Sequence, residues 1–132
     1  MTDVTLKLSK PYVVYNPEKA DKIVLPAEKG PLTVISGRAP TSLMLRRGVI
    51  RLLDKDNQPL KHYFIKNGVA DVAEDICAVS AEVVDAYTDM SKELAAEKRD
   101  AAKTQEDKDY YQMIFDEISL EAGGSFTPSV RR

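Results

Sequence analysis

The sequence predicts an all-β N-terminal sandwich followed by a C-terminal α-helical hairpin. Up to about residue 84, short runs of alternating apolar and polar residues are interrupted by turn residues every eight to twelve positions. Between there and Gly123 no glycine or proline occurs, and apolar residues recur at helical spacing. Regular short strands are typical of sandwiches and barrels, whereas the second pattern is typical of amphipathic helices.

The N-terminal region is predicted to form a series of short strands. Val4, Leu6 and Leu8 alternate with polar residues, which suits a strand with one buried face. Asn67-Gly68 predicts a hairpin with a type I′ turn, because both residues tolerate positive φ. The other turn residues are Asn16-Pro17, Pro26, Gly30-Pro31, Ser36-Gly37, Arg47-Gly48 and Asp56-Asn57. The apolar residues between them predict the core: Val13, Ile23, Val24, Leu32, Val34, Leu43, Leu45, Val49, Leu52, Tyr63, Ile65, Val69, Ile76 and Val79.

Two helices are predicted after the strands. The first should run from about Glu82 to Lys103. Its apolar stripe is formed by Val83, Tyr87, Met90 and Leu94. Thr104 followed by Asp107 resembles a capping box, so a second helix should start there. Its apolar face would hold Tyr111, Ile114 and Ile118, widened by Tyr110, Met113 and Phe115.

The second helix should end at Gly123-Gly124, with a tail after it. The predicted domains are therefore a sandwich over residues 1–84 and a two-helix hairpin over residues 85–132. The first carries a net charge of +2 and the second a net charge of −4.

Composition excludes several functional classes. A net charge of −2 without a long run of one sign does not indicate a nucleic-acid-binding domain. No stretch of about eighteen apolar residues could span a bilayer. The first ten residues lack the apolar core of a signal peptide, which predicts a protein that stays in the compartment where it is made.

The residues available for chemistry are few. The single cysteine, Cys77, lies in an apolar run and is predicted to be a small core residue. The single histidine, His62, is predicted to be a strand-edge or surface residue. Nucleophile systems of the Cys-His or Ser-His kind are excluded unless His62 alone serves. We therefore predict no catalytic residue, no metal site and no cofactor.

The motifs resemble those of the epsilon subunit of F-type ATP synthases, the delta subunit of mitochondria. That family carries a block of the type EG-x-LGI-x-PGHAPL…PG-x-(I/V)-R. Matching positions here are Glu28, Gly30, Leu32, Val34, Gly37, Ala39, Pro40, Gly48, Ile50 and Arg51. Departures from the block are Thr33, Ser36, Arg38 and Arg47. The segments KNGVADV and ICAVSA are similar to the family's next hairpin and strand, so the resemblance covers about residues 4–84.

The resemblance implies a non-catalytic rotor subunit that links gamma to the c ring and couples proton flow to ATP synthesis. It would lie peripherally on the cytoplasmic face of the bacterial inner membrane, without membrane insertion or nucleic-acid binding. Residues implied to face the c ring are Glu28, Lys29, Gly30, Pro31 and Leu32; an acidic residue stands in many relatives where this chain has Pro31. Residues implied to face gamma are Arg38, Ala39, Pro40 and Thr41.

The helical hairpin would be a regulatory element with transient contact to the alpha/beta catalytic head. In some relatives it docks there through basic residues and inhibits ATP hydrolysis. The second helix here carries Glu106, Asp107, Asp109, Asp116, Glu117 and Glu121 against Lys108 alone. Like charges would oppose docking on an acidic segment, so we expect weak inhibition or none. Residues 89–93 match a nucleotide motif of some relatives too poorly to predict a site.

Two alternatives belong to other functional classes. A free-standing β-sandwich interaction module with a helical tail would explain the composition equally well, but not the ordered motifs. A small-molecule-binding or enzymatic β-domain would need convergent polar groups, and the sequence shows no such set. The first alternative should purify away from any ATPase.

Overall fold

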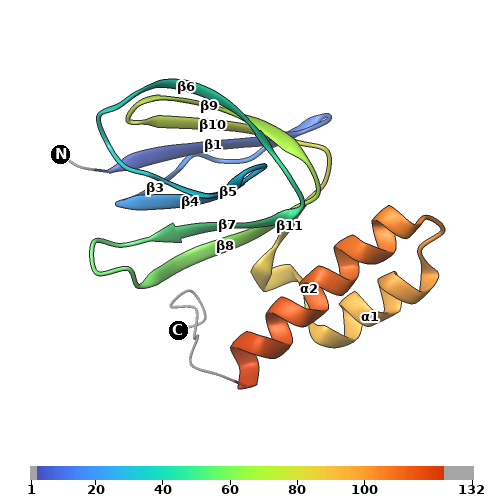
Figure 1. The fold of residues 1–132 in the computed structure, drawn as a ribbon. Helices are drawn as coiled ribbons and strands as arrows, with labels where there is room; N and C mark the ends of the chain where they lie inside the picture. The colour runs from blue at the N-terminus through green and yellow to red at the C-terminus, as the bar shows by residue number, and fades with distance from the viewer. Residues whose placement is uncertain (1–2, 124–132) are drawn as a thin grey trace.

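The computed structural model describes residues 3–123, so the predicted cap residue Gly124 and the tail lie outside the described residues. Strands form two facing layers, and two helices lie against one side of them (Figure 1). The predicted fold class, a β-sandwich followed by two helices, is confirmed. No helix in the described part is long and apolar enough to cross a membrane.

The described strands follow one hydrogen-bonded order, β11-β8-β7-β4-β6-β9-β10-β1-β2, with β5 beside β4 and β3 beside β1. One layer holds β4 (Lys22–Ala27), β5 (Gly30–Val34), β7 (Gly48–Leu53), β8 (Pro59–Ile65) and β11 (Val84–Ala86). The other holds β1 (Val4–Lys10), β2 (Val13–Val14), β3 (Glu18–Ala20), β6 (Arg38–Leu45), β9 (Gly68–Glu74) and β10 (Ile76–Ala81). The layers join where Ala27 of β4 pairs with Leu45 of β6.

The core between the layers follows the alternation of the strands. Val4, Leu6 and Leu8 are buried as predicted, and β1 pairs in parallel with β10. Other positions that are confirmed in this core are Ile23, Val34, Leu45, Leu52, Tyr63, Ile65 and Val79. Val49 is also buried, but on the outer face of its strand, in a second cluster. The prediction is wrong for Val13, Val69 and Ile76, which are exposed. In β9 and β10 the neighbours Ala70 and Cys77 point inward instead, on the same face as the buried residues Val72 and Val79.

The predicted hairpin at Asn67-Gly68 is wrong. Strand β8 pairs with β7 and β11, whereas β9 pairs with β6 and β10, so this link crosses between the layers. Neither residue is among those with positive φ in the described part. Gly68 is required for space: a Cβ there would lie 2.5 Å from the carbonyl oxygen of Ser80. Positive φ occurs at Gly30, where φ is 131°, and at Gly37, where it is 85°.

The predicted first helix begins too early. Residues Val84–Ala86 form β11 against β8, a 3₁₀ turn follows at Tyr87–Asp89, and α1 runs only over Lys92–Ala101. Ser91 sets this start, because its hydroxyl accepts a hydrogen bond from the amide of Leu94 at 3.1 Å. Strand β11 also crosses residue 84, where the sequence placed the division between sandwich and hairpin.

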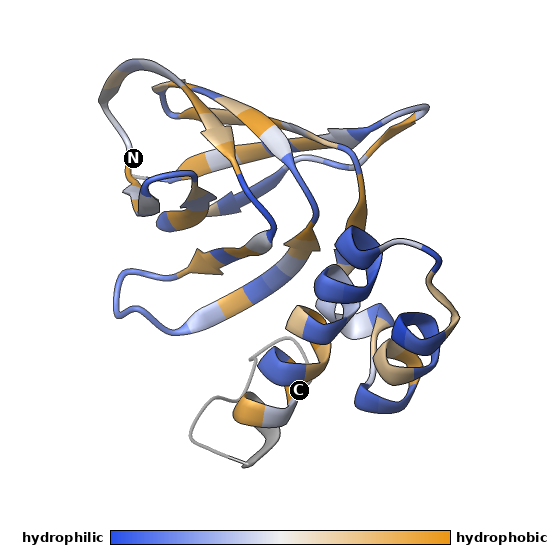
Figure 2. Ribbon diagram, turned by 45° about the vertical axis from the view of Figure 1, so that its right-hand side comes forward, coloured by the Kyte–Doolittle hydropathy of each residue, from blue (hydrophilic) through white to orange (hydrophobic). Residues whose placement is uncertain are grey.

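The second helix starts where its cap predicts. Helix α2 spans Gln105–Gly123, and the hydroxyl of Thr104 accepts from the amide of Asp107 at 3.1 Å. Its buried stripe is Tyr110, Ile114 and Ile118, spaced four residues apart, so the centre of the apolar face is Tyr110 and not Tyr111. Figure 2 shows that much of both helices is hydrophilic, which is expected when one stripe is buried.

Candidate functional site

Helix α2 covers the outer face of β7 and β8. The side chains of Val49 and Phe64 point away from the sandwich core, and they form a second apolar cluster with Tyr110, Ile114 and Ile118. The Tyr110 hydroxyl donates to Asp85 Oδ2 at 2.8 Å and lies 3.2 Å from the carbonyl oxygen of Phe64. Burial, followed by the nearby carboxylate, raises the pKa of Tyr110, so this hydroxyl stays protonated. Strand β8 is therefore buried on both faces.

Ion pairs join the acidic helix to the sandwich. Lys66 Nζ lies 2.6 Å from Asp107 Oδ1 and 3.2 Å from Glu106 Oε1, and Arg51 lies 3.2 Å from Glu117. The hydrogen bond from Asp107 raises the pKa of Lys66, and the same bond lowers the pKa of Asp107. Three of the acids that give α2 its negative charge thus pair with cations of the sandwich.

The sequence analysis predicted that His62 is a strand-edge or surface residue, and this prediction is wrong. It lies on the covered face of β8 with only 1% of its surface exposed, opposite Arg51 in the strand register. Its ring is nearly perpendicular to the ring of Tyr87, with 6.0 Å between the two ring centroids. Burial, and next the positive charge of Arg51, lower the pKa of His62 to about 4. Sequence patterns could not show this, because a helix more than forty residues away in sequence covers the strand.

Cys77 is confirmed as a small core residue. It is fully buried, and burial raises the pKa of its thiol to about 12, which disfavours the reactive thiolate. Across residues 3–123, no group of three or more His, Cys, Asp or Glu side chains is placed to hold a metal ion.

Neither described helix covers the outer face of β6, β9, β10 and β1, and we call it the uncovered face. Its outward residues form rows across the strands: Met44, Val69, Ser80 and Ser9 make one row, and Ser42, Asp71, Ala78 and Lys7 the next. Met44 is 56% exposed, Val69 43% and Ile76, further along the face, 38%. Small side chains fill much of the rest, so a partner can approach the backbone closely.

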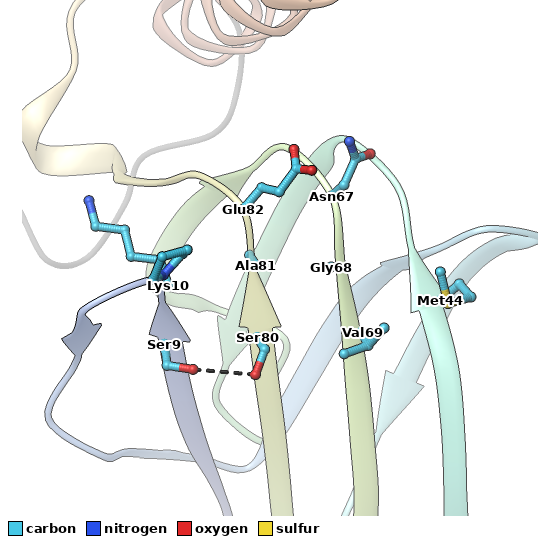
Figure 3. Close-up of a pocket in the computed structure, with 10 residues that line it drawn as sticks. Ser9, Lys10, Met44, Asn67, Gly68, Val69, Ser80, Ala81 and Glu82 are labelled. Carbon is cyan, nitrogen blue, oxygen red and sulfur yellow. Dashed lines mark hydrogen bonds between the residues drawn. The ribbon is translucent and has the colours of Figure 1, made fainter.

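A groove of about 520 Å³ lies at one end of the uncovered face. Met44 and Val69 line one side of it, and Lys10 the other (Figure 3). Between them Ser9 is hydrogen-bonded to Ser80, with 3.3 Å between the two hydroxyl oxygens. The sequence analysis missed this surface because it assigned Val69 and Ile76 to the core. A signal was present, because Ile76 and Val79 are three residues apart and must point to opposite faces of one strand.

The residues expected to face gamma begin strand β6, at the other end of the uncovered face. Arg38 is in register with Glu74 of β9, and a bulge follows between Arg38 and Thr41. Ala39 and Pro40 are exposed, and Thr41 donates from its hydroxyl to the Ala39 carbonyl at 3.1 Å. The structure thus brings this set to the rim of the uncovered face.

The residues expected to face the c ring lie elsewhere. Glu28 and Lys29 form the exposed turn between β4 and β5. Gly30 and Pro31 continue into β5, and Leu32 packs partly against the core. The amide of Glu28 donates to the Met44 carbonyl at 3.0 Å, which places this turn beside the last residues of β6. The two sets therefore occupy opposite ends of β6, about 23 Å apart for an eight-residue strand.

A sandwich with one face covered by a helical hairpin and the other left uncovered defines a class of small interaction subunit. The chain belongs to the ATP synthase delta/epsilon chain family, because the model of that family's beta-sandwich domain matches residues 3–86. Its members are non-catalytic subunits of that enzyme complex, so the identification made from the motifs is confirmed.

Curated relatives agree with this assignment. The ATP synthase epsilon chain of Rickettsia bellii (strain OSU 85-389) is 30% identical over 90 residues, covering 67% of this chain and 83% of the relative. The epsilon chain of Gluconacetobacter diazotrophicus is 28% identical over 95 residues, covering 72% and 67%.

Solved structures share the fold. A chain in the mitochondrial ATP synthase OSCP/F1/c-ring structure of Euglena gracilis aligns with a TM-score of 0.63 at 14% identity, covering 86% of this chain and 76% of that one. A chain in the central stalk/c-ring structure of the Tetrahymena thermophila mitochondrial ATP synthase aligns with a TM-score of 0.53 at 12% identity, covering 89% and 92%.

Proposed function

We propose that this chain is the epsilon subunit of the central stalk of an F-type ATP synthase. It links gamma to the c ring in the rotor and couples proton flow to ATP synthesis, as a peripheral subunit on the cytoplasmic face of the bacterial inner membrane. Family membership supports the role. The structural neighbours come from assemblies described as OSCP/F1/c-ring and as central stalk/c-ring. The observation that carries the proposal is the uncovered face, which the sandwich leaves open while the helices cover the opposite face.

The uncovered face has the properties of a protein-binding surface. Its exposed apolar residues lie among small side chains, and its two central charges, Lys7 and Asp71, have opposite signs. Nucleic acid would require an excess of positive charge, whereas apolar contacts with few charges are typical of the centre of protein interfaces. We assign this face, with Arg38, Ala39, Pro40 and Thr41 at its rim, to gamma.

The c ring is assigned to the end of the sandwich that carries the turn between β4 and β5. Glu28, Lys29, Gly30, Pro31 and Leu32 lie there, well away from the gamma-facing rim. A rotor subunit that transmits torque must hold two partners at once, and two separated surfaces on one rigid sandwich allow this.

Val69→Glu is expected to weaken binding of the full chain to gamma by at least about tenfold, because it puts an unpaired charge among the exposed apolar residues of the proposed interface. Affinity is measured with purified gamma from the same organism. The control is Leu120→Glu, which places the same charge on a residue of α2 that is 71% exposed. If both variants bind gamma as the unaltered chain does, the uncovered face is not the gamma site. If the unaltered chain binds no gamma at all, the alternative of an unrelated interaction module is favoured.

Adding the full chain to F1 that lacks its epsilon subunit should change the rate of ATP hydrolysis by less than about twofold. Glu106, Asp107 and Glu117 already pair with sandwich cations, and releasing α2 would break those pairs and expose Phe64 and Ile114. A several-fold fall in rate would contradict this expectation. The full chain is the proper reagent, because deleting residues 85–132 would cut β11 and uncover β8.

A further inference from the structure

Two arginines stand together at the end of the sandwich assigned to the c ring. Arg46 and Arg47 link β6 to β7, and with Asn67 they line a notch of about 360 Å³. Both arginines are exposed, and within residues 3–123 neither forms an ion pair. Nearby Lys66 differs, since Asp107 and Glu106 neutralise it. The notch therefore presents two positive charges that form no ion pair with a described carboxylate.

The backbone that carries these arginines is held in place. The amide of Arg46 donates to the Pro26 carbonyl at 3.0 Å, and Gly48 lies against the Pro26 ring so closely that a Cβ there would be 2.6 Å from the ring. On the other side, the Asn67 carbonyl accepts from the amide of Glu82 at 2.9 Å. A loop whose backbone is held in this way has less main-chain entropy to lose when a ligand binds to it.

The chemistry of the notch suits a carboxylate. Guanidinium groups present paired donors that match the two oxygens of a carboxylate, and the Asn67 amide supplies a further donor. Asn67 also lines the groove beside Met44 and Val69, so the notch is continuous with the uncovered face. A lipid phosphate would satisfy the same donors, but continuity with an apolar protein-binding surface favours a protein.

We propose that the notch formed by Arg46, Arg47 and Asn67 binds an aspartate or glutamate side chain of the protein that docks at this end of the sandwich. The inference rests on the proposed function, in which that protein is the c ring. The main charge contact is then made by the link between β6 and β7, with the positive charges on this chain and the negative charge on the c ring.

The test uses a complex of the full chain with gamma and the c ring of the same organism. Arg46→Lys and Arg47→Lys keep the charge and supply an amine, so a carbodiimide can couple each position directly to a carboxylate in contact with it. We expect mass spectrometry to find at least one of these links to an aspartate or glutamate of the c subunit. The double reversal Arg46→Glu/Arg47→Glu should weaken ring binding by at least about tenfold, since like charges would then meet.

The matched control is Lys92→Glu/Lys103→Glu, an equal charge reversal at two exposed lysines, one at the start of α1 and one in the link between α1 and α2. It should leave ring binding unchanged. This inference is overturned if the complex forms without such a cross-link and the double reversal does not change its affinity. The proposed function would still stand in that case. Binding to phosphatidylglycerol vesicles that only the double reversal abolishes would assign the notch to lipid and overturn it too. If the unaltered chain binds neither gamma nor the ring, the proposed function itself fails.

Discussion

Replacing Gly68 by alanine is expected to lower the free energy of unfolding by about 3 kcal/mol. The added Cβ would lie 2.5 Å from the Ser80 carbonyl oxygen and 3.1 Å from the Cα of Ala81. Both contacts are backbone atoms of β10, whose Ala81 is in register with Gly68. Because no flexible side chain can move aside, the two strands must separate where the groove forms. Urea unfolding followed by circular dichroism measures the loss.

Gly30→Ala is the control for this prediction. Nothing lies within 4 Å of the Cβ position at Gly30, but its φ of 131° is one that alanine rarely adopts. This variant therefore reports backbone strain without a steric clash, and about 1–2 kcal/mol is expected. If Gly68→Ala costs no more than the control, close approach of the strands is not the reason for glycine at position 68.

Lowering the pH from about 7 to 4 should cost about 3 kcal/mol of stability through His62 alone. Its pKa is about 4 in the folded chain, against an ordinary value of 6.5. Between those values the unfolded chain binds the proton and the folded chain does not, so the free energy of unfolding falls as the pH falls. Below about pH 4 both states are protonated and this contribution no longer changes.

The measurement compares unfolding free energies of the unaltered chain and of His62→Gln across that pH range. Carboxylates titrate equally in both, so the difference between the two curves isolates His62. Since the chain has one histidine, its ring resonance in the nuclear magnetic resonance spectrum should also stay that of the neutral form between about pH 7 and 5. Parallel stability curves, or a ring that titrates near pH 6.5, would show that the imidazole is solvated.

The fold class could be predicted because it depends on local patterns. Turn residues and period-two alternation marked the strands, and Thr104 marked the start of α2 through its own hydrogen bond. The start of α1 was placed ten residues too early, since residues 84–86 join β8 and a stripe of apolar residues does not distinguish that strand from a helix. Ser91 was the local signal that could have corrected it.

The candidate site was predictable only in part. The motifs proposed two sets of contact residues, 28–32 and 38–41, and strand pairing places these sets at opposite ends of β6. The uncovered face between them was missed. Val69 and Ile76 were predicted to be core residues. Alternation shows which residues share a face of a strand, but it does not show which face another element will cover.

The sequence by itself determined the order of strands and helices, the ordered motifs that define the family, and the near absence of reactive side chains. Tertiary structure decided which face each strand buries. Helix α2 folds back over β7 and β8, so Phe64 and His62 are buried and Lys66 is neutralised, while Met44, Val69, Arg46 and Arg47 remain open to a partner. The physical reason is that burial of a side chain depends on contacts between residues far apart in the chain, which local periodicity does not encode.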